Sequence, residues 1–121
     1  MLFKEALEIT KRLTPSLYKD EELSRWLMMC ERQIWEEIIL THTGWCCRSK
    51  PTGEADSELI VPDRFAEDIY VNFLQARIAK ENQETMKYNA AITLYNDGYT
   101  RFAKWYNERH KPLPCGLSWK V

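Results

Sequence analysis

The chain has 121 residues, of which 45% are hydrophobic and 29% charged, and its 17 basic residues nearly balance 18 acidic ones. This composition is typical of one globular domain, large enough to bury roughly two-thirds of the surface of its unfolded chain. The net charge of −1 argues against a protein that coats nucleic acid. No apolar run approaches the ~20 residues of a membrane span, and the charged N-terminus does not resemble a signal peptide. We therefore expect a soluble, non-secreted domain.

Two helices are predicted before residue 43. The first covers residues 2–13 and ends at Thr14, because Pro15 disfavours helical backbone at the residue before it. The second has Asp20 as its N-cap and runs to about His42, with Gly44 as a C-cap. Its apolar face consists of Leu23, Leu27, Cys30, Ile34 and Ile38.

An irregular, exposed loop is predicted for residues 43–57, where the helical periodicity stops and glycine and proline recur. Trp45 in this loop is expected to fold back onto the core; the alternative is an exposed contact that another chain covers. Cys46 and Cys47 are adjacent and lack the spacing of a zinc site. A metal site drawing on Cys46, Cys115, His42 and His110 has no local ligand pair to support it, so we expect neither a metal nor another cofactor.

Two more helices are predicted in the second half. Pro62 suits the first position of a helix over residues 63–82, and a turn is expected at residues 81–83. The last helix, residues 84–110, would be about 40 Å long and carries an almost wholly aromatic stripe that we expect to be mostly core. Its members are Tyr88, Ile92, Tyr95, Tyr99, Phe102 and Tyr106.

The predicted fold class is therefore all-α: about four helices in a compact bundle, with a long C-terminal aromatic-striped helix and an extended tail. Residues 1–110 form one domain and residues 111–121 the tail. No phosphate-binding loop, H-E-x-x-H or G-x-S-x-G motif occurs, and His42 and His110 are placed to cap helix C-termini. We expect a protein that is not an enzyme.

Residues 59–112 also contain a distinctive pattern of residue types. It comprises a Leu-Val-Pro start at residues 59–62, a Glu-Asp-Ile-Tyr-Val run at residues 67–71, and a series of Tyr-Asn pairs that ends in Trp105, Tyr106, His110 and Pro112. This pattern resembles the small head–tail connector (adaptor) proteins of tailed phages and prophages, and a run from Pro15 to Leu27 is similar too. The family commonly has glycine after the third helix, where this chain has Asn82-Gln83-Glu84, and the Trp45-Cys46-Cys47 loop has no counterpart in it.

The resemblance implies a virion structural protein, assembled in the host cytoplasm, that forms a ring at the portal and joins the capsid to the tail. Its partners would be the portal protein, neighbouring head and tail proteins and other copies of itself, with no membrane and no specific nucleic-acid binding. The alternative is a small helical protein-interaction or regulatory protein of phage origin. A nucleic-acid-binding protein is a third interpretation.

Three groups of residues are candidate contacts. Opposite-sign segments help to fix the register of a heterologous contact, so we expect the acidic segment 54–68 to face the basic segment 101–121 of a neighbouring subunit. The candidate interface residues are Glu54, Asp56, Glu58, Arg101, Lys104 and Arg109. The candidate portal-docking residues of the tail are Leu113, Leu117, Trp119 and Lys120, and Trp45 is the candidate exposed loop contact.

Overall fold

The structure, a computed structural model, describes residues 1–113, and it confirms the all-α prediction. The three longest α-helices are α1 (Phe3–Leu13), α2 (Asp20–Ile34) and α5 (Thr85–Arg109). The predicted helix over residues 63–82 is continuous but has three parts: α3 (Asp63–Ala66), a π-helical turn (Glu67–Val71) and α4 (Asn72–Glu81). None of the helices within residues 1–113 is long and apolar enough to cross a membrane.

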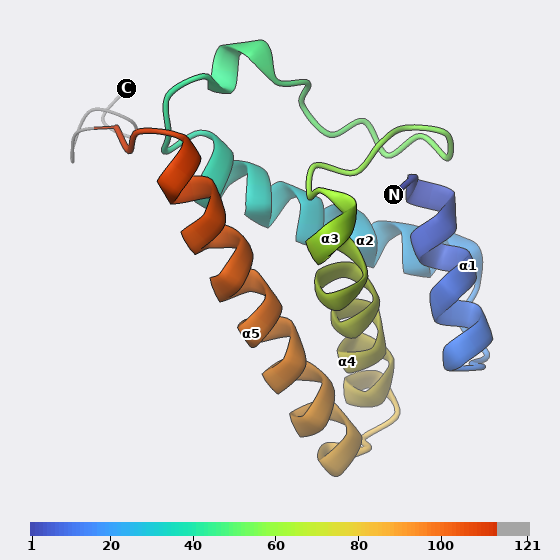
Figure 1. Ribbon diagram of the computed structural model, residues 1–121. Helices are drawn as coiled ribbons and strands as arrows, with labels where there is room; N and C mark the ends of the chain where they lie inside the picture. Colours follow the sequence, from blue (N-terminus) through green and yellow to red (C-terminus); the bar gives the residue numbers. More distant parts are fainter. Residues whose placement is uncertain (114–121) are drawn as a thin grey trace.

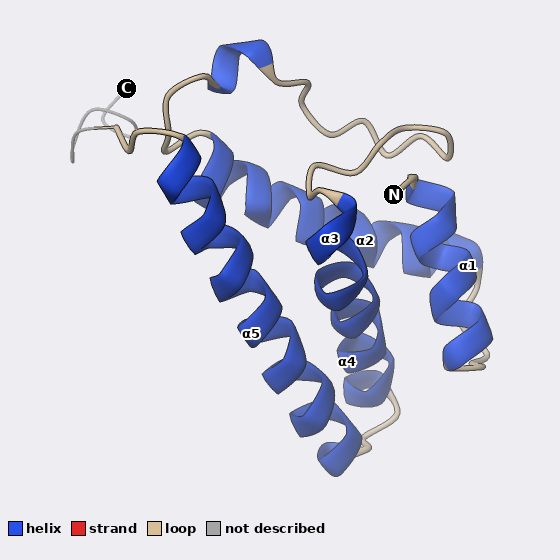
Figure 2. Cartoon of the chain, in the orientation of Figure 1, coloured by secondary structure: helices blue, strands red, loops and turns tan. Residues whose placement is uncertain are grey.

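The helices are arranged around α4. In Figure 1, α5 runs beside α4, α1 lies on the other side of α4, and α2 passes behind. The predicted loop crosses one end of this bundle, and its helical content is the single short turn Trp45–Cys47 seen in Figure 2. After this loop, Leu59 and Val61 are buried and join the same core as the helices.

Two π-helical turns allow consecutive side chains to enter the core. The first, Trp35–Ile39, continues α2, and the Leu40 amide donates to the Trp35 carbonyl five residues back at 2.9 Å. The second buries Ile69, Tyr70 and Val71 in succession, which an α-helix with a single buried face does not do. A regular periodicity therefore underestimates how much of this segment is buried.

The aromatic stripe of α5 is core, as predicted. Tyr95, Phe102 and Tyr106 are buried, whereas Tyr88, Ile92 and Tyr99 are half-buried. The ring of Phe102 lies 5.8 Å from that of Phe65, and the ring of Tyr95 lies 5.4 Å from that of Phe73. Rings of α5 thus contact both α3 and α4. Tyr99 keeps its hydroxyl at the edge of the core, where it donates to the Glu37 carboxylate.

The helix ends differ from the prediction at three positions. Lys19 occupies the N-cap position of α2, and Asp20 is the first helical residue, because its carboxylate pairs with Lys11 at 2.9 Å instead of capping. The helix ends at Ile39, short of His42, and Gly44 lies beyond it with a φ of +86° that turns the chain into the loop. Pro62 precedes the first helical residue of α3. The turn at residues 81–83 is confirmed, with Gln83 at a φ of +58°.

Gly98 marks the closest approach between α5 and the π-helical turn Glu67–Val71. A Cβ atom at this position would lie 3.2 Å from the Cβ of Asp68 and 3.4 Å from Cγ1 of Ile69. Gly98 is buried in the middle of α5, where glycine usually lowers helix stability. Because it has no side chain, the two helices can pack closely at this position.

We predict that Gly98→Leu destabilises the protein by about 2 kcal/mol or more, because the larger side chain forces the two helices apart. Thr100→Leu, on the exposed side of the same helix, is the matched control and should change the free energy of unfolding by less than about 0.5 kcal/mol. Chemical denaturation followed by circular dichroism measures both. Equal stability of the Gly98 variant and the wild type would contradict the close approach.

Candidate functional site

The predicted acidic contact residues lie on an exposed segment that is held against α1. Glu54, Asp56 and Glu58 are all exposed. The backbone beside them is fixed, because the amides of Phe3 and Lys4 donate to the carbonyls of Ser57 and Ala55 at 2.9 and 3.0 Å. The segment is therefore positioned by main-chain hydrogen bonds as well as by charge.

Most of the acidic side chains between residues 54 and 68 already have a cationic partner in the same chain. Asp56 pairs with Lys4 at 2.9 Å, and Asp68 pairs with Arg101 at 3.0 Å. The amino group of Met1 pairs with Glu58 and Asp63. Of the six acidic residues in this segment, Glu54 and Glu67 are the two without an ion pair within residues 1–113. These two carboxylates are the ones available for the predicted contact between subunits.

The basic contact residues divide in the same way. Arg101 bonds to both Asp97 and Asp68 at 3.0 Å, so its charge is satisfied on the chain's own surface. Lys104 and Arg109 are exposed and have no ion pair in the described part of the chain. The guanidinium of Arg109 lies over the Trp105 ring at 4.6 Å. The three residues predicted as one group therefore have two different environments.

The start of the predicted tail is bound to the segment 41–43, which follows the π-helical turn Trp35–Ile39. The Leu113 amide donates to the Thr41 carbonyl, and the Thr43 amide donates to the Lys111 carbonyl, both at 2.8 Å. His42 supports this pairing: its Nδ1 lies 2.6 Å from the Ile38 carbonyl, which confirms the predicted capping role, and its Nε2 lies 3.2 Å from Oδ1 of Asn107. Leu117, Trp119, Lys120 and Cys115 lie outside the described residues.

Trp45 does not fold back fully onto the core. Its side chain remains 44% exposed in the short turn Trp45–Cys47, because Gly44 with its positive φ directs the chain away from the bundle before this residue. The same turn is closed by the Arg48 amide, which donates to the Trp45 carbonyl at 3.0 Å. The alternative interpretation, an exposed aromatic residue in the loop, fits the structure.

The sequence did not predict an open groove of about 450 Å³ that borders the N-terminal half of α5. Its floor is α4, and its sides are the end of α1 and the first half of α5. Leu13 and Leu94 on the two sides are 55% and 57% exposed, which is unusual for leucines that line a concave surface. At the edge of the groove, Lys87 and Glu84 pair at 2.9 Å.

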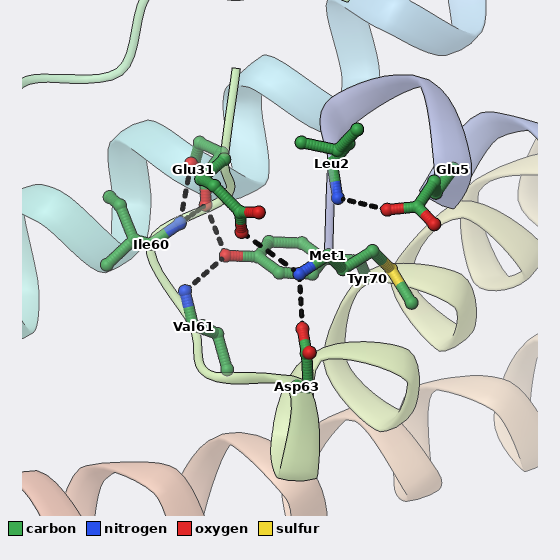
Figure 3. A network of polar contacts seen from close by, with 9 residues as sticks. Met1, Leu2, Glu5, Glu31, Ile60, Val61, Asp63 and Tyr70 are labelled. Atoms are coloured by element: carbon green, nitrogen blue, oxygen red, sulfur yellow. Dashed lines mark hydrogen bonds and ion pairs between the residues drawn. The ribbon is translucent and has the colours of Figure 1, made fainter. Parts of the chain in front are cut away.

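A buried carboxylate connects α2 to the segment that precedes α3. Glu31 is 2% exposed and accepts hydrogen bonds from the Ile60 amide, at 3.2 Å, and from the Tyr70 hydroxyl. Figure 3 shows the Tyr70 hydroxyl between Glu31 and the Val61 amide, which donates to it at 3.1 Å. The network fixes residues 60 and 61 over the core and gives both buried side chains hydrogen-bond partners.

Burial determines the proton affinity of this network. Removal from water raises the pKa of Glu31 to about 7, although the hydrogen bonds from Tyr70 and the Ile60 amide act in the opposite direction. Burial also raises the pKa of Tyr70, to which the nearby Glu31 adds. The pKa of the Cys30 thiol is raised for the same reason, so Cys30 is the small buried hydrophobic residue that the sequence predicted.

The sequence contained a signal for Glu31. It lies four residues after Leu27 and three before Ile34, on the apolar face of the predicted second helix. A charged residue at such a position is either buried with partners or marks an error in the assigned face. Its hydrogen-bond partners lie at residues 60–70, and the sequence alone does not identify partners so far away in the chain.

Comparisons of the chain with models of known protein families, with curated proteins and with solved structures find no match. Within residues 1–113, no group of three or more His, Cys, Asp or Glu side chains is placed to hold a metal ion.

We predict that Glu31→Gln removes a pH-dependent loss of stability. Because the pKa of Glu31 is about 7 in the folded protein and 4.5 without the shift, the folded state binds more protons between these values, and wild-type stability falls as the pH rises through this range. The fall amounts to roughly 3 kcal/mol at most. The glutamine variant should lack it and be the more stable protein at about pH 8.

Denaturant titrations at about pH 5 and about pH 8 measure this difference. Glu36→Gln, an exposed position on the same helix, is the control and should keep the wild-type pH dependence. A Glu31→Gln variant with the wild-type fall would show that another group titrates.

Proposed function

We propose that the chain is a head–tail connector, a virion structural protein without enzymatic activity that assembles in the host cytoplasm as a ring at the portal and joins the capsid to the tail. The proposal begins from the resemblance in residues 59–112. The position of the residues that carry this resemblance, in the core of the fold, supports the proposal.

The residues that carry the resemblance are the ones that build the second half of the fold. Val61 and Tyr70, from two separate parts of the pattern, are joined by a hydrogen bond of 3.1 Å. Tyr95, Phe102 and Tyr106 from the Tyr-Asn series are buried against the α3–α4 helix. The pattern therefore specifies packing, which is the kind of similarity that a shared fold produces.

The surface supports an assembly of identical subunits. A ring requires two different patches that meet head to tail. The chain has a groove along the first half of α5, and Lys104 and Arg109, which form no ion pair within residues 1–113, lie about 15 to 22 Å beyond Leu94, the last α5 residue of the groove. Two such separated and chemically distinct patches suit heterologous contacts with neighbours on either side.

The test is to mix the purified protein with portal rings from its own gene cluster and to weigh the product by native mass spectrometry. We expect a discrete mass gain of about one copy per portal subunit. A variant that ends at Leu113 should lose most of this gain if the tail grips the portal. Truncation at residue 113 retains the two hydrogen bonds that join residues 111–113 to residues 41–43, so it separates docking from folding.

The charge part of the proposal has its own variants. Glu54→Lys with Glu67→Lys reverses the two unpaired carboxylates of the acidic segment and leaves the pairs that hold α1 intact. We expect weaker ring formation on the portal at low salt, and no change for the control Glu36→Lys. A folded, monomeric wild-type protein that adds no mass to the portal would contradict the connector proposal and favour the regulatory alternative.

A further inference from the structure

Three arginines from separate segments lie over one aromatic cluster at the C-terminal end of α5. Arg48 lies 5.5 Å from the centre of the Tyr106 ring, Arg64 lies 5.1 Å from that of Phe65, and Arg109 lies 4.6 Å from that of Trp105. All three arginines are exposed. They come from the loop, from α3 and from α5; Arg64 and Arg109 lie over rings of their own helices, and Arg48 lies over a ring that is distant in the sequence.

The rings beneath these arginines form a continuous cluster. Trp105 lies 5.6 Å from Phe65 and 6.1 Å from Phe102, and Phe102 lies 5.9 Å from Tyr106. A guanidinium over an aromatic face is attracted to it and loses part of its freedom, while its N–H groups remain available to an anion. The cluster thus supports three partly ordered hydrogen-bond donors.

The charges of this surface have no partner in the described part of the chain. None of the three arginines forms an ion pair within residues 1–113, and neither do the exposed lysines that flank them in sequence, Lys50, Lys104 and Lys111. Glu67 and Glu108, the neighbouring exposed acids, form no ion pair either. The acidic segment 54–68 is the chain's own candidate partner, but four of its six carboxylates form ion pairs within their own subunit.

We propose that this arginine–aromatic surface, formed by Arg48, Arg64, Arg109 and the rings beneath them, binds the phosphodiester backbone of nucleic acid without sequence specificity. A guanidinium matches a phosphate group with two parallel N–H donors, and a nucleic-acid strand offers such groups in series to donors from several segments at once. Contacts to phosphate position a protein on nucleic acid but read no bases. This activity goes beyond the proposed connector function, with which it shares Arg109, a candidate contact between subunits.

The exposed Trp45 favours nucleic acid over an acidic protein as the partner. Trp45 belongs to the same short turn as Arg48 and is 44% exposed, and an exposed aromatic ring beside basic residues is the usual platform on which an unpaired base stacks. An acidic peptide would use the charges but would have no comparable use for the ring. The expected preference is therefore for single-stranded over duplex nucleic acid of the same length.

The test is fluorescence anisotropy with a labelled single-stranded DNA of about 20 nucleotides and its duplex, at about 50 and 200 mM salt. The triple variant Arg48→Gln, Arg64→Gln, Arg109→Gln should bind at least about tenfold more weakly at the lower salt and with a smaller salt dependence. The matched control is Arg12→Gln, Arg25→Gln, Arg32→Gln, which removes three exposed arginines of α1 and α2 that also have no ion pair within residues 1–113. It should bind within about twofold of the wild type.

Three outcomes would overturn the proposal: no binding by the wild type at the lower salt, equal weakening in the control, or equally tight binding of labelled polyglutamate of the same charge. The last would assign the surface to an acidic protein. If the triple variant does not fold by circular dichroism, the three single variants replace it, and each should weaken binding while Arg25→Gln does not. Because no portal is present in this assay, its result is independent of the connector test.

Discussion

The packing of the α5 aromatic face against the α3–α4 helix is the contact on which the rest of the structure depends. The rings of Phe102 and Tyr95 meet those of Phe65 and Phe73 on the two parts of that helix. Gly98 lies between these two contacts and allows α5 to approach the π-helical turn closely. Large aromatic areas are removed from water along a helix of 25 residues, so this interface supplies much of the hydrophobic stabilisation.

A second constraint joins the irregular part of the chain to this packed pair. The buried Glu31 of α2 holds the Ile60 amide and the Tyr70 hydroxyl, and Tyr70 in turn holds the Val61 amide. A carboxylate at this depth is tolerated because its hydrogen bonds are satisfied and because it is easily protonated. The loop after residue 43 is thus irregular in structure but firmly attached at its end.

These two constraints leave α5 with different surroundings along its length. Its first half borders the groove over α4, and its end underlies the arginine–aromatic surface. Each surface requires residues from at least two other segments: α1 and α4 for the groove, and the loop and α3 for the arginines. A single long helix therefore places two chemically distinct surfaces at a fixed separation.

The sequence by itself determined the helices, the break at Pro15, the turn at residues 81–83 and the burial of the aromatic stripe, because these follow from local periodicity and from residues that restrict the backbone. It did not determine the π-helical turns, whose extra residue is stabilised by packing. Nor did it determine the partners of Glu31, the contact of Arg48 with Tyr106 or that of Phe65 with Trp105, since residues so distant in the chain meet only after the helices have packed. The net charge of −1 does not indicate which charges are paired. Within residues 1–113, most acids of the segment 54–68 form ion pairs and Arg48, Arg64 and Arg109 form none, because the tertiary structure decides which charges are neighbours.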